Sequence, residues 1–164
     1  MMDTSGKYWR PIRRDELRPE RIHDPYRAHF KFADGTRCPD CGAVFVHGRW
    51  QWSAQAPAHE ALCPACHRIR DGLPAGYLTL SGPFVAHHRD ELVRLMRHHE
   101  SHEKIEHPLE RIMAVDDLNG SLMVTTTGIH IARRLGDALH DAYKGELAYH
   151  YNEAENLLRI SWTR

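Results

Sequence analysis

The sequence predicts an α+β protein with an N-terminal zinc ribbon, a long amphipathic helix and a C-terminal ββαββ unit. Two Cys-x-x-Cys pairs stand 21 residues apart in the first half of the chain. A helical pattern covers about residues 83–105, and two strand hairpins around a second helical pattern follow it. We expect four parts: a basic, partly disordered arm (1–29), the zinc ribbon (30–80), the linking amphipathic helix (81–107) and the ββαββ domain (108–164).

Composition and charge narrow the class of protein. The 164-residue chain has no apolar run near the roughly 20 residues that cross a bilayer. Residues 1–14 are polar and basic, which favours a cytoplasmic protein without a membrane partner. The net charge is zero, but residues 1–37 carry 9 basic and 6 acidic side chains, and residues 105–164 carry 6 and 9. An N-terminal nucleic-acid contact is one interpretation, and an ordinary solvated surface is the other.

The predicted ribbon begins where the arm ends, because residues 1–29 contain too few apolar residues to fold alone. Phe30 and Phe32 alternate with a lysine and lead through an Asp-Gly turn into the first cysteine pair. Apolar residues at even spacing around a His-Gly pair predict a β-hairpin after it. The second cysteine pair follows a loop over residues 51–62 and is expected to form a second knuckle.

The four cysteines are the candidate metal ligands, namely Cys38, Cys41, Cys63 and Cys66. Structural zinc takes four thiolates in a tetrahedron, and two Cys-x-x-Cys pairs at this separation supply them. In a reducing compartment such pairs favour metal binding over a disulfide framework. The alternatives are a single iron in a rubredoxin-like site and four cysteines without metal. Four protein ligands leave no open coordination position, so we do not expect a catalytic metal.

The long helix is expected to begin at Pro83 and carries a concentration of histidines. Six histidines lie between positions 87 and 107, and His98 and His102 share one helical face. These side chains could bind a second metal, although the His-Glu order of zinc proteases is missing and solvated histidines are the simpler interpretation. The sequence has no Gly-rich phosphate loop, nucleophile elbow or pair of catalytic carboxylates. We therefore expect no enzyme, and no small-molecule substrate is evident.

The C-terminal unit is predicted from two turn signals and one helical repeat. Asn119-Gly120 is a strong hairpin signal, because both turn positions favour positive φ. Thr127 is expected to cap the helix that follows, and Gly145 to end it. This helix covers one sheet face, and the second face is either open or covered by the long helix. The expected elements are strands over 112–118 and 122–127, a helix over 129–144, and strands over 147–151 and 158–162.

Basic and aromatic side chains beside the cysteines and on the last helix are candidate RNA contacts. Such groups pair with phosphates and stack on unpaired bases. The alternative is that the tryptophans fill a small core and the charged groups face solvent. The candidates are Arg49, Trp52, Arg68, Arg70, Arg133 and Arg134.

The order of these motifs resembles a known family. Cys-Pro-x-Cys-Gly is followed by a second Cys-x-x-Cys pair, a long helix, and a Val-Thr-Thr-Thr segment leading into Ile-Ala-Arg-Arg-Leu at 131–135. Over about residues 36–164 this pattern is similar to the archaeal and eukaryotic adaptor for nuclear export of the large ribosomal subunit, of which the chain looks like a short prokaryotic relative. The resemblance implies a zinc-bearing region that binds the large subunit. Export is not implied, because the chain has four cysteines only and lacks a leucine-rich export signal.

Taken together, these patterns predict a non-enzymatic zinc-ribbon protein that binds the ribosome, in particular its large subunit, or structured RNA, in assembly or stress protection. One alternative is a protein–protein scaffold or regulator in which the zinc only staples the fold. The other is a one-iron, rubredoxin-like redox protein. The patterns do not predict an oligomeric state.

Overall fold

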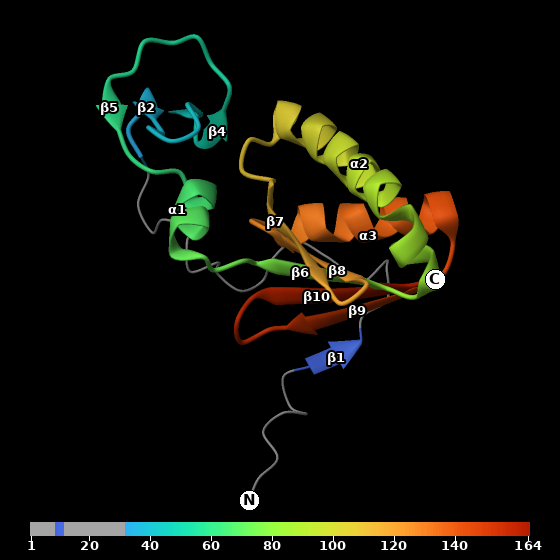
Figure 1. Ribbon diagram of the computed structural model, residues 1–164. Helices are drawn as coiled ribbons and strands as arrows, with labels where there is room; N and C mark the ends of the chain where they lie inside the picture. Colours follow the sequence, from blue (N-terminus) through green and yellow to red (C-terminus); the bar gives the residue numbers. More distant parts are fainter. Residues whose placement is uncertain (1–8, 12–31) are drawn as a thin grey trace, which may run out of the picture.

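The computed structural model describes residues 9–11 and 32–164. Within these residues a small cysteine-bearing part, which we call the cysteine module (32–73), sits beside a larger part, which we call the sheet domain (75–164) (Figure 1). Strand β1 (Trp9–Pro11) pairs antiparallel with the outer strand of the sheet domain. The rest of the predicted arm lies outside the described residues. No helix among the described residues is long and apolar enough to cross a membrane.

The cysteine module contains a four-stranded sheet and one helix. Strands β3 and β4 form the expected hairpin, and its His47-Gly48 turn has φ values of 50° and 81°. Phe32, Phe45 and Trp50 pack edge-to-face at centroid separations of 5.2 to 5.6 Å, so Trp50 belongs to the core. The elements are β2 (Thr36–Arg37), β3 (Val44–Val46), β4 (Arg49–Gln51), β5 (His59–Glu60) and α1 (Pro64–Asp71), with strand order β4-β3-β2-β5.

The expected ribbon with two knuckles is corrected in its second half. Cys63 is the N-cap of α1 and Cys66 lies in the first turn of this helix, so the second pair is not on a hairpin. Pro64 at the first helical position and Gly72, whose φ of 64° ends the helix, are the local signals that favour α1. The helix was missed because it is short and mostly polar, with only Ala65, Cys66 and Arg68 buried.

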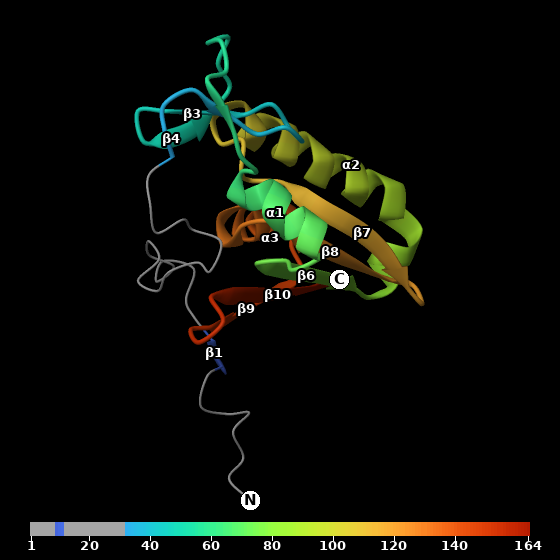
Figure 2. The same ribbon diagram turned by 90° about the vertical axis from the view of Figure 1, so that its left-hand side faces the viewer.

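The sheet domain contributes five strands to a six-stranded sheet, whose sixth strand is β1, and it places two helices on one face of this sheet. Helices α2 (Pro83–Glu106) and α3 (Ile129–Tyr143) lie on the same side in both views (Figures 1 and 2). They share a core with the sheet that includes Leu80, Leu92, Leu135 and Trp162. Among the described residues, no helix covers the other face of the sheet, so the alternative of an open second face is the one that holds there. The strands are β6 (Gly76–Ser81), β7 (Ile112–Leu118), β8 (Ser121–Thr126), β9 (Glu146–Asn152) and β10 (Leu157–Thr163).

Strand β6 was not predicted, and it changes the expected domain organisation. The sheet order is β1-β9-β10-β6-β8-β7, with β6 parallel to β10 and antiparallel to β8. The predicted order of strands and helix over 108–164 is present, but its two hairpins meet only through β6. The boundaries at 80 and 107 are therefore corrected, because β6 and α2 belong to the sheet domain and α2 is not a linker between domains.

The caps of α3 also differ from the expectation. Gly128, not Thr127, is the N-cap residue, and no side chain of the cap accepts a hydrogen bond. Instead the Glu110 carboxylate accepts a hydrogen bond from the Ile131 backbone N–H at 3.0 Å. At the other end Lys144 is the C-cap residue and has a positive φ of 62°, and Gly145 follows with a φ of 83°. A carboxylate from a distant loop thus satisfies the helix N-terminus.

Candidate metal centre

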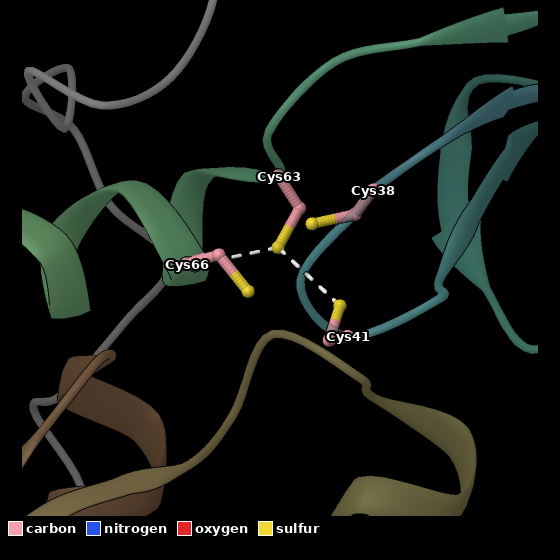
Figure 3. A group of neighbouring side chains, drawn as sticks. All are labelled: Cys38, Cys41, Cys63 and Cys66. Carbon is pink, nitrogen blue, oxygen red and sulfur yellow. Dashed lines mark hydrogen bonds between the residues drawn. The ribbon is translucent and has the colours of Figure 1, made fainter.

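The four cysteines converge on one point between the cysteine module and the sheet domain. Figure 3 shows their sulfurs turned toward a common centre, two from the loop between β2 and β3 and two from the start of α1. All four Sγ atoms lie within 4.8 Å of one another, and the sulfurs of Cys41 and Cys63 are 3.8 Å apart. Cys38, Cys63 and Cys66 are buried, and Cys41 is half-buried. The structure therefore brings the predicted ligands together.

Local backbone geometry explains how each pair is presented. In the first pair, the Cys38 N–H donates to the Ala43 carbonyl at 2.8 Å and the Gly42 N–H donates to the Cys38 carbonyl at 2.9 Å. Gly42 has a φ of 82°, which glycine adopts without strain. In the second pair, the Cys66 N–H donates to the Cys63 sulfur at 3.4 Å. The N-terminus of α1 thus stabilises a negative charge on these sulfurs.

The donor set fits one tetrahedral ion. Zinc–thiolate bonds of about 2.3 Å place the sulfurs of a regular tetrahedron about 3.8 Å apart. The Cys41–Cys63 separation of 3.8 Å agrees with this value. Among the described residues, these cysteines are the one group of three or more metal-ligating side chains close enough to share an ion. The tetrad is therefore a possible metal site, and its thiolates suit zinc or iron.

Proton binding to the thiols opposes metal binding. The contact between Cys41 and Cys63 lowers the pKa of Cys41 to about 5 and raises the pKa of Cys63. Burial raises the pKa of Cys66 to about 11. Because metals bind the thiolate form, an ion must displace protons from at least the Cys63 and Cys66 thiols near neutral pH.

Arg111 is a member of the site that the sequence did not indicate. It lies just before β7, 45 residues beyond Cys66, and its side chain is 8% exposed. Its Nη2 donates to the Cys63 sulfur at 3.4 Å and to the Cys66 sulfur at 3.2 Å. Burial opposes its charge, but the hydrogen bond to Cys66 and the nearby thiolates raise the pKa of the guanidinium. No local pattern marks Arg111, because only the tertiary fold brings it to the cysteines.

Two of the RNA candidates instead hold the cysteine module together. Arg68 is buried, and its Nη1 donates to the Leu73 carbonyl at 2.9 Å. Arg70 donates to both carboxylate oxygens of Asp40 at 2.8 and 2.6 Å, which joins α1 to the first cysteine loop. This pair also lowers the pKa of Asp40.

The other RNA candidates lie on separate elements. The Trp52 indole N–H donates to the Lys104 carbonyl at 2.7 Å, and Arg134 pairs with Glu103 at 3.0 Å. Arg133 lies 3.8 Å from Asp137 one turn along α3. Arg49 is exposed on β4. The structure thus places the six candidates on a β-strand, a loop and two helices, and it uses most of them for contacts within the chain.

Comparisons with known proteins found no relative of this chain. No family model, curated protein or solved structure matches the chain. The resemblance to the export adaptor family stays an expectation from the motifs.

The histidines of α2 lie close together without forming a larger ligand group. The His98 and His102 rings are 4.5 Å apart, and the His98 and His99 rings are 5.9 Å apart. Burial lowers the pKa of His99. Within the described part of the chain, no third ligand completes a metal site with His98 and His102.

Proposed function

We propose that the protein is a non-catalytic binding protein whose fold is stabilised by a structural zinc ion. The observation that carries this proposal is the convergence of four cysteine sulfurs within 4.8 Å. Such a set supplies every ligand of a tetrahedral ion, so no position is left for a substrate or an activated water. The ion would join the β2–β3 loop to the start of α1 and thus close the cysteine module. A single iron in the same thiolates remains the redox alternative.

Metal analysis of the purified full-length chain tests this proposal. We expect about one zinc per chain and a colourless protein, because four-thiolate zinc absorbs no visible light. The variant Cys63→Ser should lose the ion and the folded cysteine module, since the binding free energy of such sites is largely folding free energy. Protein purified without chelator and free of metal would contradict the proposal, and one iron with a red colour would support the redox alternative.

For the partner, we propose the ribosome, in particular its large subunit, or structured RNA. Two observations support this proposal: the motif resemblance, and the excess of basic residues over 1–37. Basic side chains that bind RNA phosphates release counterions, so the affinity for RNA should fall as the salt concentration rises. Because Arg68 and Arg70 are engaged within the module, the phosphate contacts are assigned to Arg49 and the arginines of residues 1–29. The same engagement favours the second candidate, a protein–protein scaffold.

Co-sedimentation with ribosomal particles at several salt concentrations separates the two candidates. An RNA-binding protein should be released by salt, and Arg49→Gln should reduce the slope of log affinity against log salt by about one. Deletion of residues 1–29 should reduce the slope further. Zinc content is measured in each variant so that loss of fold is recognised. Absence of co-sedimentation by folded, metal-loaded full-length protein would remove the ribosome proposal and favour the scaffold.

A further inference from the structure

Arg111 connects the sheet domain to the cysteine sulfurs through its own side chain. Its backbone N–H donates to Thr127 Oγ1 at 2.9 Å, which fixes it at the start of β7 beside the end of β8. Its guanidinium then reaches out of the sheet domain to Cys63 and Cys66 at 3.4 and 3.2 Å. Both ends of this residue are therefore held, one by the sheet domain and one by the cysteine module.

Among the residues that the structure describes, the guanidinium of Arg111 has no carboxylate partner. Its hydrogen-bond acceptors are the two sulfurs, and its buried Nε has no partner within the described residues. Asp40 lies near enough for Arg111 to lower its pKa, but the Asp40 carboxylate is already paired with Arg70. A buried cation is costly unless an anion compensates it. The sulfurs of Cys63 and Cys66 are the groups placed to do so, once a bound metal ion holds them as thiolates.

A metal tetrathiolate has the charge that this arrangement requires. Four thiolates around a divalent ion carry a net charge of about −2, which one guanidinium reduces to about −1. Two N–H···S hydrogen bonds also withdraw electron density from the sulfurs, and partners of this kind typically change metal affinity by about 10- to 100-fold. Both hydrogen bonds come from the single Nη2 atom of Arg111, which carries two hydrogens.

We propose that Arg111 is the charge partner and positioning residue of the metal centre, so that the sheet domain helps to retain the ion bound by the cysteine module. This inference rests on the proposed structural metal. It adds a fifth residue to the site, one that touches the ligands and not the ion. It also predicts that metal loss loosens the contact between the two parts of the protein.

The test compares full-length wild type with Arg111→Met, Arg111→Lys and the control Arg89→Met. Arg89 is also in the sheet domain, but it pairs with Asp117 at 2.6 and 2.8 Å. We expect Arg111→Met to weaken zinc binding by about 10- to 100-fold in competition with a chromogenic chelator. Zinc release on challenge with a thiol-modifying reagent should be faster by a similar factor. Arg111→Lys should recover part of the loss, and Arg89→Met should match wild type.

A spectroscopic measurement distinguishes a direct effect on sulfur from a general loss of stability. In the Co²⁺-substituted protein, the sulfur-to-cobalt charge-transfer band should move to lower energy in Arg111→Met, because sulfurs without N–H donors release electrons more readily. The band of Arg89→Met should not move. If Arg111→Met does not fold with saturating metal, the same shift and release rate are measured in Arg111→Lys, where a smaller effect in the same direction is expected.

The results distinguish a wrong role for Arg111 from a wrong assignment of the structural metal. A wild-type chain that binds neither zinc nor cobalt overturns the structural metal, and the assignment of Arg111 with it. A wild-type chain that binds one ion, with affinity, release rate and charge-transfer band unchanged in the Arg111 variants, overturns the assignment alone. Weaker binding with a shifted band in the Arg111 variants supports both.

Discussion

The indole N–H of Trp52 donates a hydrogen bond of 2.7 Å to the backbone carbonyl of Lys104, 52 residues away. Lys104 lies in the last turn of α2, where the backbone carbonyls have no partner within the helix. The bond therefore joins the loop after β4 to the end of this helix. Leu109, from the segment after α2, packs against the apolar core of the cysteine module. The stretch 104–111 therefore contacts the cysteine module through Lys104, Leu109 and Arg111.

Removal of the Trp52 hydrogen bond should loosen this contact. In Trp52→Phe the aromatic ring remains but the donor is lost, and we expect the free energy of unfolding to fall by about 1 kcal/mol, the usual net value of one hydrogen bond. Urea denaturation at saturating zinc measures the change. The neighbouring Ile105 is 67% exposed, so Ile105→Ala is the control and should stay near wild type. A Phe variant as stable as the control would show that the bond contributes nothing.

A fragment of residues 108–164 should not fold, although it contains all elements of the predicted ββαββ unit. It lacks β6, which stands between β10 and β8 and contributes the fully buried Leu78 and Leu80. Loss of a buried leucine side chain alone costs about 2 to 5 kcal/mol, which is comparable to the stability of a small domain. A fragment of residues 74–164 restores β6 and α2 and should unfold cooperatively. Circular dichroism during heating distinguishes the two, and cooperative melting of the shorter fragment would contradict this view of β6.

Two glycines at the interface of α3 with the sheet should respond in opposite ways to alanine. A Cβ on Gly76 would lie 2.4 Å from Thr126 Oγ1 and 2.5 Å from Ala132 Cβ, so Gly76→Ala should destabilise by about 1 to 3 kcal/mol. A Cβ on Gly136 would lie 3.2 Å from Ile160 Cγ2 and 3.3 Å from Leu147 Cδ1, so these side chains need to shift by only a few tenths of an ångström. Gly136→Ala gains up to about 1 kcal/mol of helix propensity, and we expect it to be neutral or stabilising. Denaturation curves check both, and equal effects would refute the packing argument.

The buried carboxyl of Glu110 should make stability depend on pH. Burial raises the pKa of Glu110, so the folded chain holds this proton more tightly than the unfolded chain. Its contribution to stability is therefore fully present below the ordinary carboxyl pKa and is lost as pH rises through the folded value. Each pKa unit between the two states corresponds to about 1.4 kcal/mol.

The variant Glu110→Gln isolates this effect, because it keeps an oxygen for the Ile131 N–H but does not titrate. We expect the free energy of unfolding of the variant minus that of wild type to increase as pH rises from about 5 to 7.5. Zinc loss in acid affects both proteins and cancels in the difference. Exposed Glu106→Gln is the control and should follow the wild-type profile. A difference that stays constant over this range would show that Glu110 is not perturbed.

The sequence by itself determined the features that depend on local chemistry. The cysteine spacing indicated a four-ligand metal site, and the helix beginning at Pro83 and the Asn119-Gly120 hairpin lie where their signals predict them. These features follow from capping, turn and ligand preferences that act within a few residues. The same local signals indicated α3 between two hairpins, although the tertiary structure assigned its N-terminal contact to Glu110.

Only the tertiary structure decided how distant segments meet. Strand β6 is central because it pairs with β10, more than 75 residues later, and a six-residue strand next to a helix start has no local signal for that partner. Arg111 reaches Cys63 and Cys66 for the same reason, since the fold and not the spacing brings a guanidinium to the sulfurs. Arg68 and Arg70 resembled phosphate ligands in the sequence, but the structure gives them acceptors within the chain. A charged side chain takes its role from the groups that the fold places around it, and a sequence pattern does not encode the distances to those groups.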